Sequence, residues 1–307
     1  MDRIAFLFAG QGAQFPGMGK DLYETNAQAK AVFDMGEALR PGTLKQCFES
    51  DQETLSLTEN TQPCLFLTDL ACARALQAEG VTASAAAGFS LGEIAALAFS
   101  GVLSDEEAFL LVMERAKAMS ACAAAHPGAM AAVLKLTPEA VEGLCSQFRE
   151  VWPVNYNCPG QIAVAGAAAE MDAFCEAVKA AGGRAIRLPV SGAFHTPYMK
   201  EASQHLLTVL SGKALKAPQI PLYSNYTAQV YPTAAADIAQ TAALQASNSV
   251  RWEAILRNMQ AAGIDAWVEV GAGKTLSGFV NRTFPGTKIA NVGDAAALKQ
   301  AAELLLQ

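Results

Sequence analysis

Residues 88–92 have the sequence Gly-Phe-Ser-Leu-Gly, a Gly-x-Ser-x-Gly pentapeptide between the small residues of 81–87 and an apolar helical run at 93–99. The pattern is typical of a nucleophile elbow, a sharp turn that leads from a strand into a helix. Its two glycines would let the turn close without Cβ clashes, so that the hydroxyl of Ser90 projects from it. A helix that starts at Ser90 would also direct the positive end of its dipole at a developing oxyanion. The pentapeptide alone fits equally well with a plain turn in which Ser90 is an N-cap.

The composition indicates a globular chain that does not bind nucleic acid. Its 307 residues are enough for one large domain, or for a large domain that carries a smaller insert. Apolar residues make up 52% and charged residues 17%, which excludes a disordered or fibrous chain. The net charge is −7, and no segment concentrates Lys and Arg as phosphate binding would require. We therefore expect no nucleic-acid partner.

The apolar segments and the cysteines indicate a cytoplasmic protein. No apolar run approaches the roughly 20 residues of a membrane span, and the start of the chain leads into a strand-like segment without a signal-peptide pattern. The seven cysteines are an odd number, include no Cys-x-x-Cys pair and lie in apolar patterns. Their spacing favours buried free thiols over disulfides or zinc ligands. We expect no membrane partner and no bound metal.

The outer parts of the chain predict an α/β domain with a mostly parallel sheet. The apolar run from Ile4 to Phe8 predicts a buried strand that enters a tight loop at 10–14. This loop lacks the third glycine of a dinucleotide fingerprint, because Phe15 stands at that position. Amphipathic stretches at 21–39 and 64–79 predict helices that cover the sheet. Further strands are predicted at 220–224, 267–270 and 289–291.

The middle of the chain predicts a separate small domain. From residue 128 to residue 190 the strand and helix patterns follow the order β-α-β-β-α-β, which is that of a ferredoxin-like unit. We therefore expect an α/β-hydrolase-like catalytic domain formed by residues 1–125 and 191–307, and a ferredoxin-like insert at 126–190. An active site in the cleft between the two domains follows.

A serine nucleophile needs a base within hydrogen-bond reach, most often a histidine, and the chain has three. His126 stands beside a helix-breaking proline and His205 in the middle of a predicted helix, where solvent-exposed roles are usual. His195, in a loop just before Pro197, remains as the candidate base, and the order Ser then His fits the elbow-type enzymes. No acid directly precedes His195, which favours a dyad whose second imidazole nitrogen bonds a main-chain carbonyl.

Arg115 places a charge on an apolar helix face. The capping box that begins at Ser104 predicts a long helix, and the alternating spacing of four and three residues puts positions 108, 112, 115, 119 and 122 on one side of it. An unpaired guanidinium on that side would be costly. Arg115 is therefore either part of a buried salt bridge, a snorkelling side chain, or a bidentate clamp for a substrate carboxylate.

Six motifs extend the pattern over the chain. They are residues 10–14 (GQGAQ), 88–93 (GFSLGE), 113–115 (MER) with Met119, 155–161 (NYNCPGQ), 192–196 (GAFHT) and 269–274 (EVGAGK). In this order and spacing the chain resembles the malonyl-CoA:acyl carrier protein transacylases from Ile4 to about Leu305.

The resemblance implies roles for individual residues. Ser90 would be the nucleophile and His195 the base, and Arg115 would bind the malonyl carboxylate. The main-chain amides of Gln11 and Leu91 would form the oxyanion hole. A carbonyl near Arg251 would orient the base, and Phe194 would disfavour a methylmalonyl group.

The implied reaction moves a malonyl group from coenzyme A to the phosphopantetheine thiol of acyl carrier protein in fatty acid synthesis, through a malonyl-serine ester. Malonyl-CoA and acyl carrier protein are therefore the expected partners of a monomer that needs no cofactor, since the coenzyme A thioester is a substrate. Two other enzymes stay possible: a free-standing acyltransferase of a polyketide pathway, and a serine thioesterase or esterase. A non-catalytic module that docks carrier proteins would be expected to lack Ser90 or His195, and the chain has both.

Overall fold

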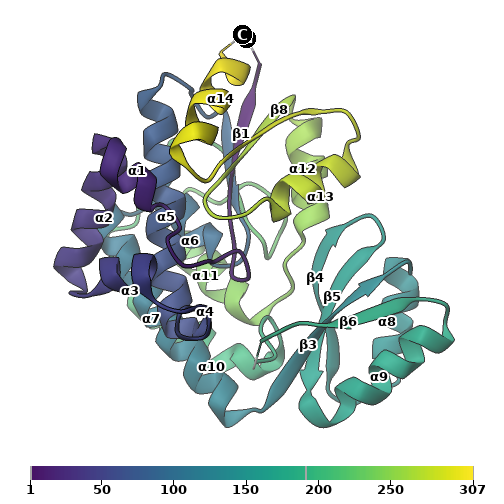
Figure 1. Ribbon diagram of the computed structural model, residues 1–307. Coiled ribbons are helices and arrows are strands. Elements are labelled where there is room, and N and C mark those ends of the chain that lie inside the picture. The colour runs from purple at the N-terminus through teal and green to yellow at the C-terminus, as the bar shows by residue number, and fades with distance from the viewer. Residues whose placement is uncertain (1, 191, 307) are drawn as a thin grey trace.

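The computed structural model describes residues 2–190 and 192–306 as a mixed α/β protein with two separate sheets (Figure 1). Ser191, where the sequence places the return to the large domain, lies outside the described residues, as do the chain ends Met1 and Gln307. None of the helices in the two described ranges is both long and apolar enough to cross a membrane.

The first sheet has five parallel strands in the order β7-β2-β1-β8-β9. These are β1 (Ile4–Phe8), β2 (Ala85–Gly88), β7 (Leu222–Tyr223), β8 (Ala266–Val270) and β9 (Lys288–Val292). β1, β2 and β8 are buried along their whole length, as expected for parallel strands covered on both faces. On β1, Phe6 and Phe8 belong to the core on one face, whereas Ala5 and Leu7 belong to the core on the other.

Helices cover both faces of this sheet. The Phe6 face packs against α5 (Thr58–Ala78), α6 (Gly92–Phe99) and α14 (Ala295–Leu305), and the Leu7 face packs against α12 (Trp252–Ala261) and α13 (Thr275–Thr283). In Figure 1, α5 lies to the left of β1 and the α12–α13 pair lies to its right. The other helices of this part are α1 (Lys20–Thr25), α2 (Ala27–Leu39), α3 (Thr43–Glu49), α4 (Gln52–Ser56), α10 (Lys200–Ser211) and α11 (Ala235–Leu244), with the short 3-10 helices η1 (Pro197–Met199) and η2 (Gln245–Ser247).

Two predicted helices have different bounds in the structure. The stretch 21–39 is divided at Asn26, whose backbone is extended and whose side chain caps α2 by accepting two of its amides. The helix expected from residue 64 begins at Thr58, so that Pro63 lies inside α5. At Asn26 the side-chain cap overrides the pattern of apolar residues, whereas α5 begins without a side-chain cap.

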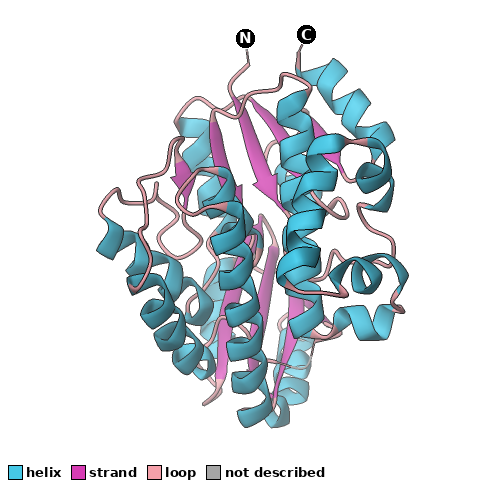
Figure 2. Cartoon of the chain, turned by 90° about the vertical axis from the view of Figure 1, so that its left-hand side faces the viewer, coloured by secondary structure: helices cyan, strands magenta, loops and turns pink. Residues whose placement is uncertain are grey.

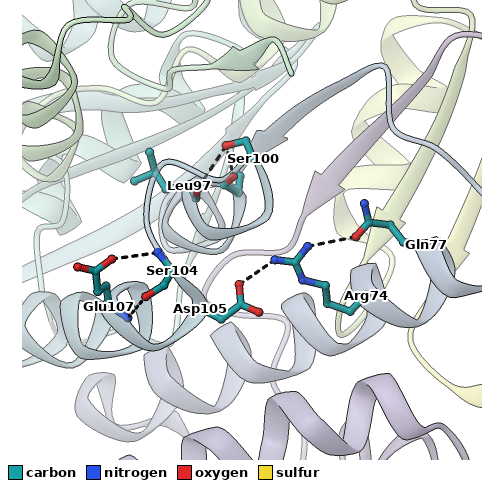
Figure 3. A network of polar contacts seen from close by, with 8 residues as sticks. Arg74, Gln77, Leu97, Ser100, Ser104, Asp105 and Glu107 are labelled. Atoms are coloured by element: carbon teal, nitrogen blue, oxygen red, sulfur yellow. Dashed lines mark hydrogen bonds and ion pairs between the residues drawn. The ribbon is translucent and has the colours of Figure 1, made fainter. Parts of the chain in front are cut away.

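The predicted capping box fixes the start of α7 (Asp105–Ala125), as Figure 3 shows. The hydroxyl of Ser104 accepts the Glu107 amide at 3.1 Å, and the Glu107 carboxylate accepts the Ser104 amide at 3.1 Å. Arg74 of α5 adds an ion pair of 2.8 Å with Asp105. These contacts fix the register of the helix that carries Arg115.

Residues 128–187 form a second, antiparallel sheet in the order β4-β5-β3-β6. Its elements are β3 (Gly128–Leu134), α8 (Pro138–Cys145), β4 (Val151–Cys158), β5 (Gln161–Ala167), α9 (Ala168–Ala180) and β6 (Arg184–Arg187), which is the predicted β-α-β-β-α-β order. The helices α8 and α9 cover one face of this sheet. On its other face, Met130 and Ala165 pack into the hydrophobic core that also contains Phe6. Figure 2 shows the strands of the two sheets one above the other, with both chain ends at the top.

Candidate active site

The pentapeptide at 88–92 forms a strand-turn-helix elbow. β2 ends at Gly88 and α6 begins at Gly92, so the helix does not start at Ser90 as the sequence suggested. Ser90 itself has a left-handed backbone with φ 53°, which costs a non-glycine residue about 1–2 kcal/mol. The two glycines are required by close packing: a Cβ on Gly88 would lie 2.0 Å from the Gly92 carbonyl carbon, and one on Gly92 would lie 2.3 Å from the Phe8 oxygen.

Ser90 and His195 form a hydrogen-bonded dyad. The Ser90 Oγ lies 2.7 Å from His195 Nε2, although the two residues are 105 positions apart. His195 is buried, and its backbone is left-handed with φ 63°. Its Nδ1 lies 3.0 Å from the main-chain oxygen of Gln245. Because a carbonyl can only accept, Nδ1 carries the proton and Nε2 is free to accept one from Ser90.

The hydrogen bond to His195 Nδ1 is therefore made by the Gln245 oxygen and not by that of Arg251, which the resemblance suggested; the backbone of Asn248, three residues before Arg251, also acts on the imidazole. The oxygen of Arg251 instead accepts the amide of Ile255, at 3.0 Å. The short helix η2 follows α11 directly and brings the oxygen of its first residue, Gln245, to the imidazole. The prediction that a main-chain carbonyl holds the base is correct in kind.

The imidazole of His195 is neutral over the physiological range. Burial lowers its pKa to about 4, and the nearby positive charge of Arg115 acts in the same direction. The base is thus unprotonated and available before the reaction begins.

Arg115 lies on the buried face of α7, as its spacing predicted, and is only 1% exposed. Its Nη1 donates to Gln62 Oε1 at 2.8 Å, and its Nη2 donates to Gln245 Oε1 and to Ser90 Oγ, both at 3.1 Å. Burial lowers the pKa of Arg115 to about 10, so it remains charged. None of the ion pairs in the described ranges includes Arg115, and its Nε has no hydrogen-bond partner there. A buried charge with only neutral partners, beside a nucleophile, is suited to an anionic substrate.

A cavity of about 90 Å³ lies above the dyad, between the two sheets. Its walls are formed by Gln11, Phe89, Ser90, Arg115, Met119, Met130, Asn155, Leu188, Val190, Phe194 and His195. It adjoins a depression of about 890 Å³, which shares Gln11, Leu188, Val190 and Phe194 with it. The small chamber has room for a short acyl group, and the larger one can hold a long substituent attached to it.

The role of the main-chain amides of Gln11 and Leu91 as oxyanion donors stays a prediction, and their surroundings are compatible with it. Gln11 follows β1 in the first loop and lines the cavity, and Leu91 is the N-cap of α6 directly after the nucleophile. Within the described ranges neither amide donates a hydrogen bond to a protein acceptor. Free donors beside a serine oxygen are what a tetrahedral intermediate requires.

Two site residues were missed in the sequence. Gln62 and Gln245 are buried and bond to Arg115 from α5 and η2. Gln62 precedes a proline in an apolar stretch, and Gln245 ends an alanine-rich run. Gln62 follows the polar residues 58–61 and Gln245 comes shortly before the polar residues 247–249, so neither stands out in the sequence. Among the described residues, no group of His, Cys, Asp and Glu could hold a metal ion.

Comparison with known proteins agrees with this geometry. Residues 5–301 match the family model described as "Acyl transferase domain". The malonyl CoA-acyl carrier protein transacylase of Bacillus subtilis is 39% identical over 99% of this chain and 98% of its own. The crystal structure of the transacylase of that name from Clostridium perfringens superposes with a TM-score of 0.94, at 33% identity, and covers 99% of this chain and 97% of its own. A malonyl-transacylase solved in complex with a type II PKS acyl-carrier protein has a TM-score of 0.94 and 32% identity, covering 98% of this chain and 99% of its own. The chain belongs to the malonyl CoA-acyl carrier protein transacylase family of acyl transferases.

Proposed function

We propose that this protein transfers a malonyl group from coenzyme A to the phosphopantetheine thiol of acyl carrier protein, in fatty acid synthesis. The observation that carries the proposal is the buried Arg115 guanidinium, which touches the Ser90 hydroxyl at 3.1 Å and otherwise contacts only neutral amides. A malonyl group carries a free carboxylate that one methylene separates from the reacting carbonyl, so one end can meet Arg115 while the other meets Ser90. A hydrolase of neutral esters has no use for this charge.

The first half of the reaction acylates the serine. Ser90 Oγ attacks the thioester carbonyl while His195 Nε2 takes its proton. The amides of Gln11 and Leu91 stabilise the oxyanion, and one such donor is typically worth about 3–4 kcal/mol of barrier. When the tetrahedral intermediate collapses, the C–S bond breaks and His195 returns the proton to the coenzyme A sulfur. A malonyl-Ser90 ester and free coenzyme A result.

The second half repeats these steps in reverse order with a different thiol. The phosphopantetheine thiol of the carrier protein enters the cavity that coenzyme A has left, and His195 takes its proton as the sulfur attacks the ester. The C–O bond to Ser90 breaks and the serine oxygen regains the proton. Exchange of one pantetheine arm for another in the same depression explains why a single site serves both substrates.

The finer description of the fold is part of this proposal. The all-parallel sheet with its elbow after β2 supports an α/β-hydrolase-like domain at 1–125 and 191–307. The strand order β4-β5-β3-β6 with two helices on one face supports a ferredoxin-like insert at 126–190. We further propose a cytoplasmic monomer that uses no metal or other cofactor and binds neither nucleic acid nor a membrane.

Phe194 is proposed as a specificity residue. It lines both the small cavity and the larger depression, and it directly precedes the base. A branched acyl group such as methylmalonyl would carry its extra methyl toward this ring.

One relative in complex with a polyketide carrier protein gives a specific reason to keep a polyketide acyltransferase as the second candidate. The two candidates share all chemistry and differ only in the carrier protein that they serve.

Stopped-time transfer assays test the proposal. The protein, malonyl-CoA and a holo carrier protein of fatty acid synthesis should yield malonyl carrier protein with ping-pong kinetics, and the same reaction with a type II polyketide carrier separates the two pathways by kcat/KM. Release of free malonate with no malonyl carrier protein would show a thioesterase instead.

A further inference from the structure

Three buried polar residues lie beneath the nucleophile elbow on the side away from the cavity. Asn225 follows β7, the neighbour of β2 in the sheet, and Glu93 lies in the first turn of α6. Tyr231 follows a turn after β7. All three are at most 3% exposed, and none of them lines the cavity above the dyad. The chemistry described so far does not use them.

The side chain of Asn225 spans the elbow. Its Nδ2 donates to the oxygen of Gly88 at 2.7 Å, and its Oδ1 accepts the amide of Ser90 at 2.7 Å. One amide group therefore fastens the last residue of β2 and the nucleophile itself, on either side of Phe89. Because Ser90 has a left-handed backbone, its conformation depends on contacts from outside the turn.

Asn225 is itself held at every polar atom. Its amide donates to Glu93 Oε2 at 2.7 Å, and its oxygen accepts the amide of Arg251 at 3.0 Å. Its Oδ1 also accepts the Nε2 of Gln245 at 3.3 Å. The other carboxylate oxygen of Glu93, Oε1, accepts the hydroxyl of Tyr231. Four hydrogen-bonding groups of one buried side chain and its backbone are thus satisfied, which fixes its rotamer.

Burial of the Glu93 carboxyl group, which accepts the Asn225 amide, costs free energy. The group is fully buried, and among the described residues no lysine or arginine forms an ion pair with it. Burial raises its pKa to about 7. The positive charge of Arg115 offsets part of this cost, and the carboxyl group in addition orients the Asn225 amide and the Tyr231 hydroxyl.

We propose that Asn225, oriented by the Glu93–Tyr231 pair, is a positioning residue that holds Ser90 Oγ at hydrogen-bond distance from His195. This inference rests on the proposed function, because the acylation of Ser90 is the step that it serves. Asn225 touches neither substrate nor the reacting oxygen. It acts through the backbone of Ser90, whose displacement by about 1 Å would be enough to slow attack by about 100-fold.

A purely structural role makes a different prediction. If the three residues only stabilised the packing of β2, β7 and α6, their loss would lower the melting temperature but leave the acylation rate of each folded molecule unchanged. A positioning role lowers the single-turnover acylation rate and leaves the KM for malonyl-CoA unchanged, since the elbow amide that meets the substrate, that of Leu91, acts on the oxyanion of the transition state.

The matched test compares Asn225→Ala with Asn258→Ala. Asn258 also donates its Nδ2 to a main-chain oxygen, that of Ala228 in the same loop region, at 2.8 Å, but it contacts no residue of the elbow. Both variants lose one side-chain amide of the same size, which is fully buried at Asn225 and half-buried at Asn258. We expect the acylation rate of Asn225→Ala to fall by about 10- to 100-fold with KM within about twofold of wild type, and that of Asn258→Ala, per folded molecule, to stay near wild type.

Tyr231→Phe provides a second variant that removes a single oxygen and keeps the ring. It leaves Glu93 Oε1 without its donor, so Asn225 loses its support indirectly and a smaller decrease of about 3- to 10-fold is expected. Phosphonylation of Ser90 by a small fluorophosphonate reports on the nucleophile without any malonyl contact, and it should slow in both variants in parallel with acylation.

The outcomes separate this inference from the proposed function. A wild-type protein that the fluorophosphonate labels but malonyl-CoA does not acylate would refute the function and leave the positioning role testable by phosphonylation. Rates for Asn225→Ala and Tyr231→Phe equal to that of Asn258→Ala, per folded molecule and with either reagent, would overturn the inference. If Asn225→Ala does not fold, the rates of Tyr231→Phe alone decide between the two.

Discussion

Replacement of Arg115 by alanine should change the acyl selectivity of the enzyme rather than its basic chemistry. The guanidinium is buried on α7 and is bound to Gln62, Gln245 and the Ser90 hydroxyl. When a malonyl group arrives, its carboxylate can accept two charge-assisted hydrogen bonds from the planar fork. An acetyl group has no carboxylate and gains nothing from this side chain.

The magnitude follows from these contacts. Each hydrogen bond to a charged group is worth about 1.5–3 kcal/mol, and the bond from Arg115 to Ser90 Oγ, worth about 1 kcal/mol, is given up when the substrate binds. The net loss for malonyl is then about 2–5 kcal/mol, which overlaps the usual cost of about 3–5 kcal/mol for breaking a buried charge pair. At about 1.4 kcal/mol per factor of ten, kcat/KM for malonyl-CoA should fall by about 30- to 4000-fold. The value for acetyl-CoA should stay level or rise, because a buried positive charge no longer faces a neutral chain.

Competitive acylation by malonyl-CoA and acetyl-CoA measures this effect as a ratio. The ratio does not depend on the fraction of active protein, which matters because the truncation also leaves a cavity and two unpaired glutamines. Arg115→Lys serves as the control, because it keeps the charge and loses the bidentate fork. Its malonyl-to-acetyl ratio should lie between those of the wild type and Arg115→Ala. An unchanged malonyl-to-acetyl ratio in Arg115→Ala would refute the clamp and make Arg115 a structural residue.

Three further outcomes are expected. The kcat/KM for acylation should fall as the pH drops toward the His195 pKa of about 4, where the base becomes protonated, and any change between pH 5 and 7 should come from Glu93, whose pKa is about 7; a fall centred near 6.5 that persists in Glu93→Gln would show that the imidazole is not buried. Phe194→Ser should raise the methylmalonyl-to-malonyl ratio by about 10-fold, because the space of one methyl group opens beside the base; equal ratios in competition assays would remove Phe194 from the specificity site. Gly92→Ala should lower the free energy of unfolding in urea by about 1–3 kcal/mol or more, since its Cβ would lie 2.3 Å from the Phe8 oxygen, whereas Gly278→Ala, with open space around it, should not.

The positions of Ser90 at the turn and of Arg115 on the buried helix face could be predicted because each depends on local sequence. Gly88 and Gly92 approach the neighbouring backbone too closely for any side chain, so the turn around Ser90 requires the Gly-x-Ser-x-Gly pattern that the sequence shows. The direction of Arg115 follows from helix periodicity alone, once the capping box has fixed where α7 begins. His195 was reached by elimination among three histidines, and the structure places it 2.7 Å from the serine.

The supporting residues could not be predicted because they depend on long-range packing. The carbonyl on His195 comes from Gln245, 50 positions away, and was expected near Arg251 instead. Asn225 reaches Ser90 across 135 positions through the pairing of β7 with β2, and β7 consists of only two residues. A strand of two residues shows no alternation of apolar and polar residues, so its pairing register, which brings Asn225 to the elbow, cannot be predicted from the sequence.

The central claim is that Ser90 carries the malonyl group between two thiols, and intact-mass measurement tests it most directly. Wild-type protein mixed with malonyl-CoA should gain the mass of one malonyl group, peptide mapping should place it on Ser90, and addition of holo acyl carrier protein should remove it and add the same mass to the carrier. The Ser90→Ala protein should gain no mass. Malonylation of Ser90→Ala at another residue, or transfer to the carrier protein without any acylated wild-type enzyme, would contradict the account.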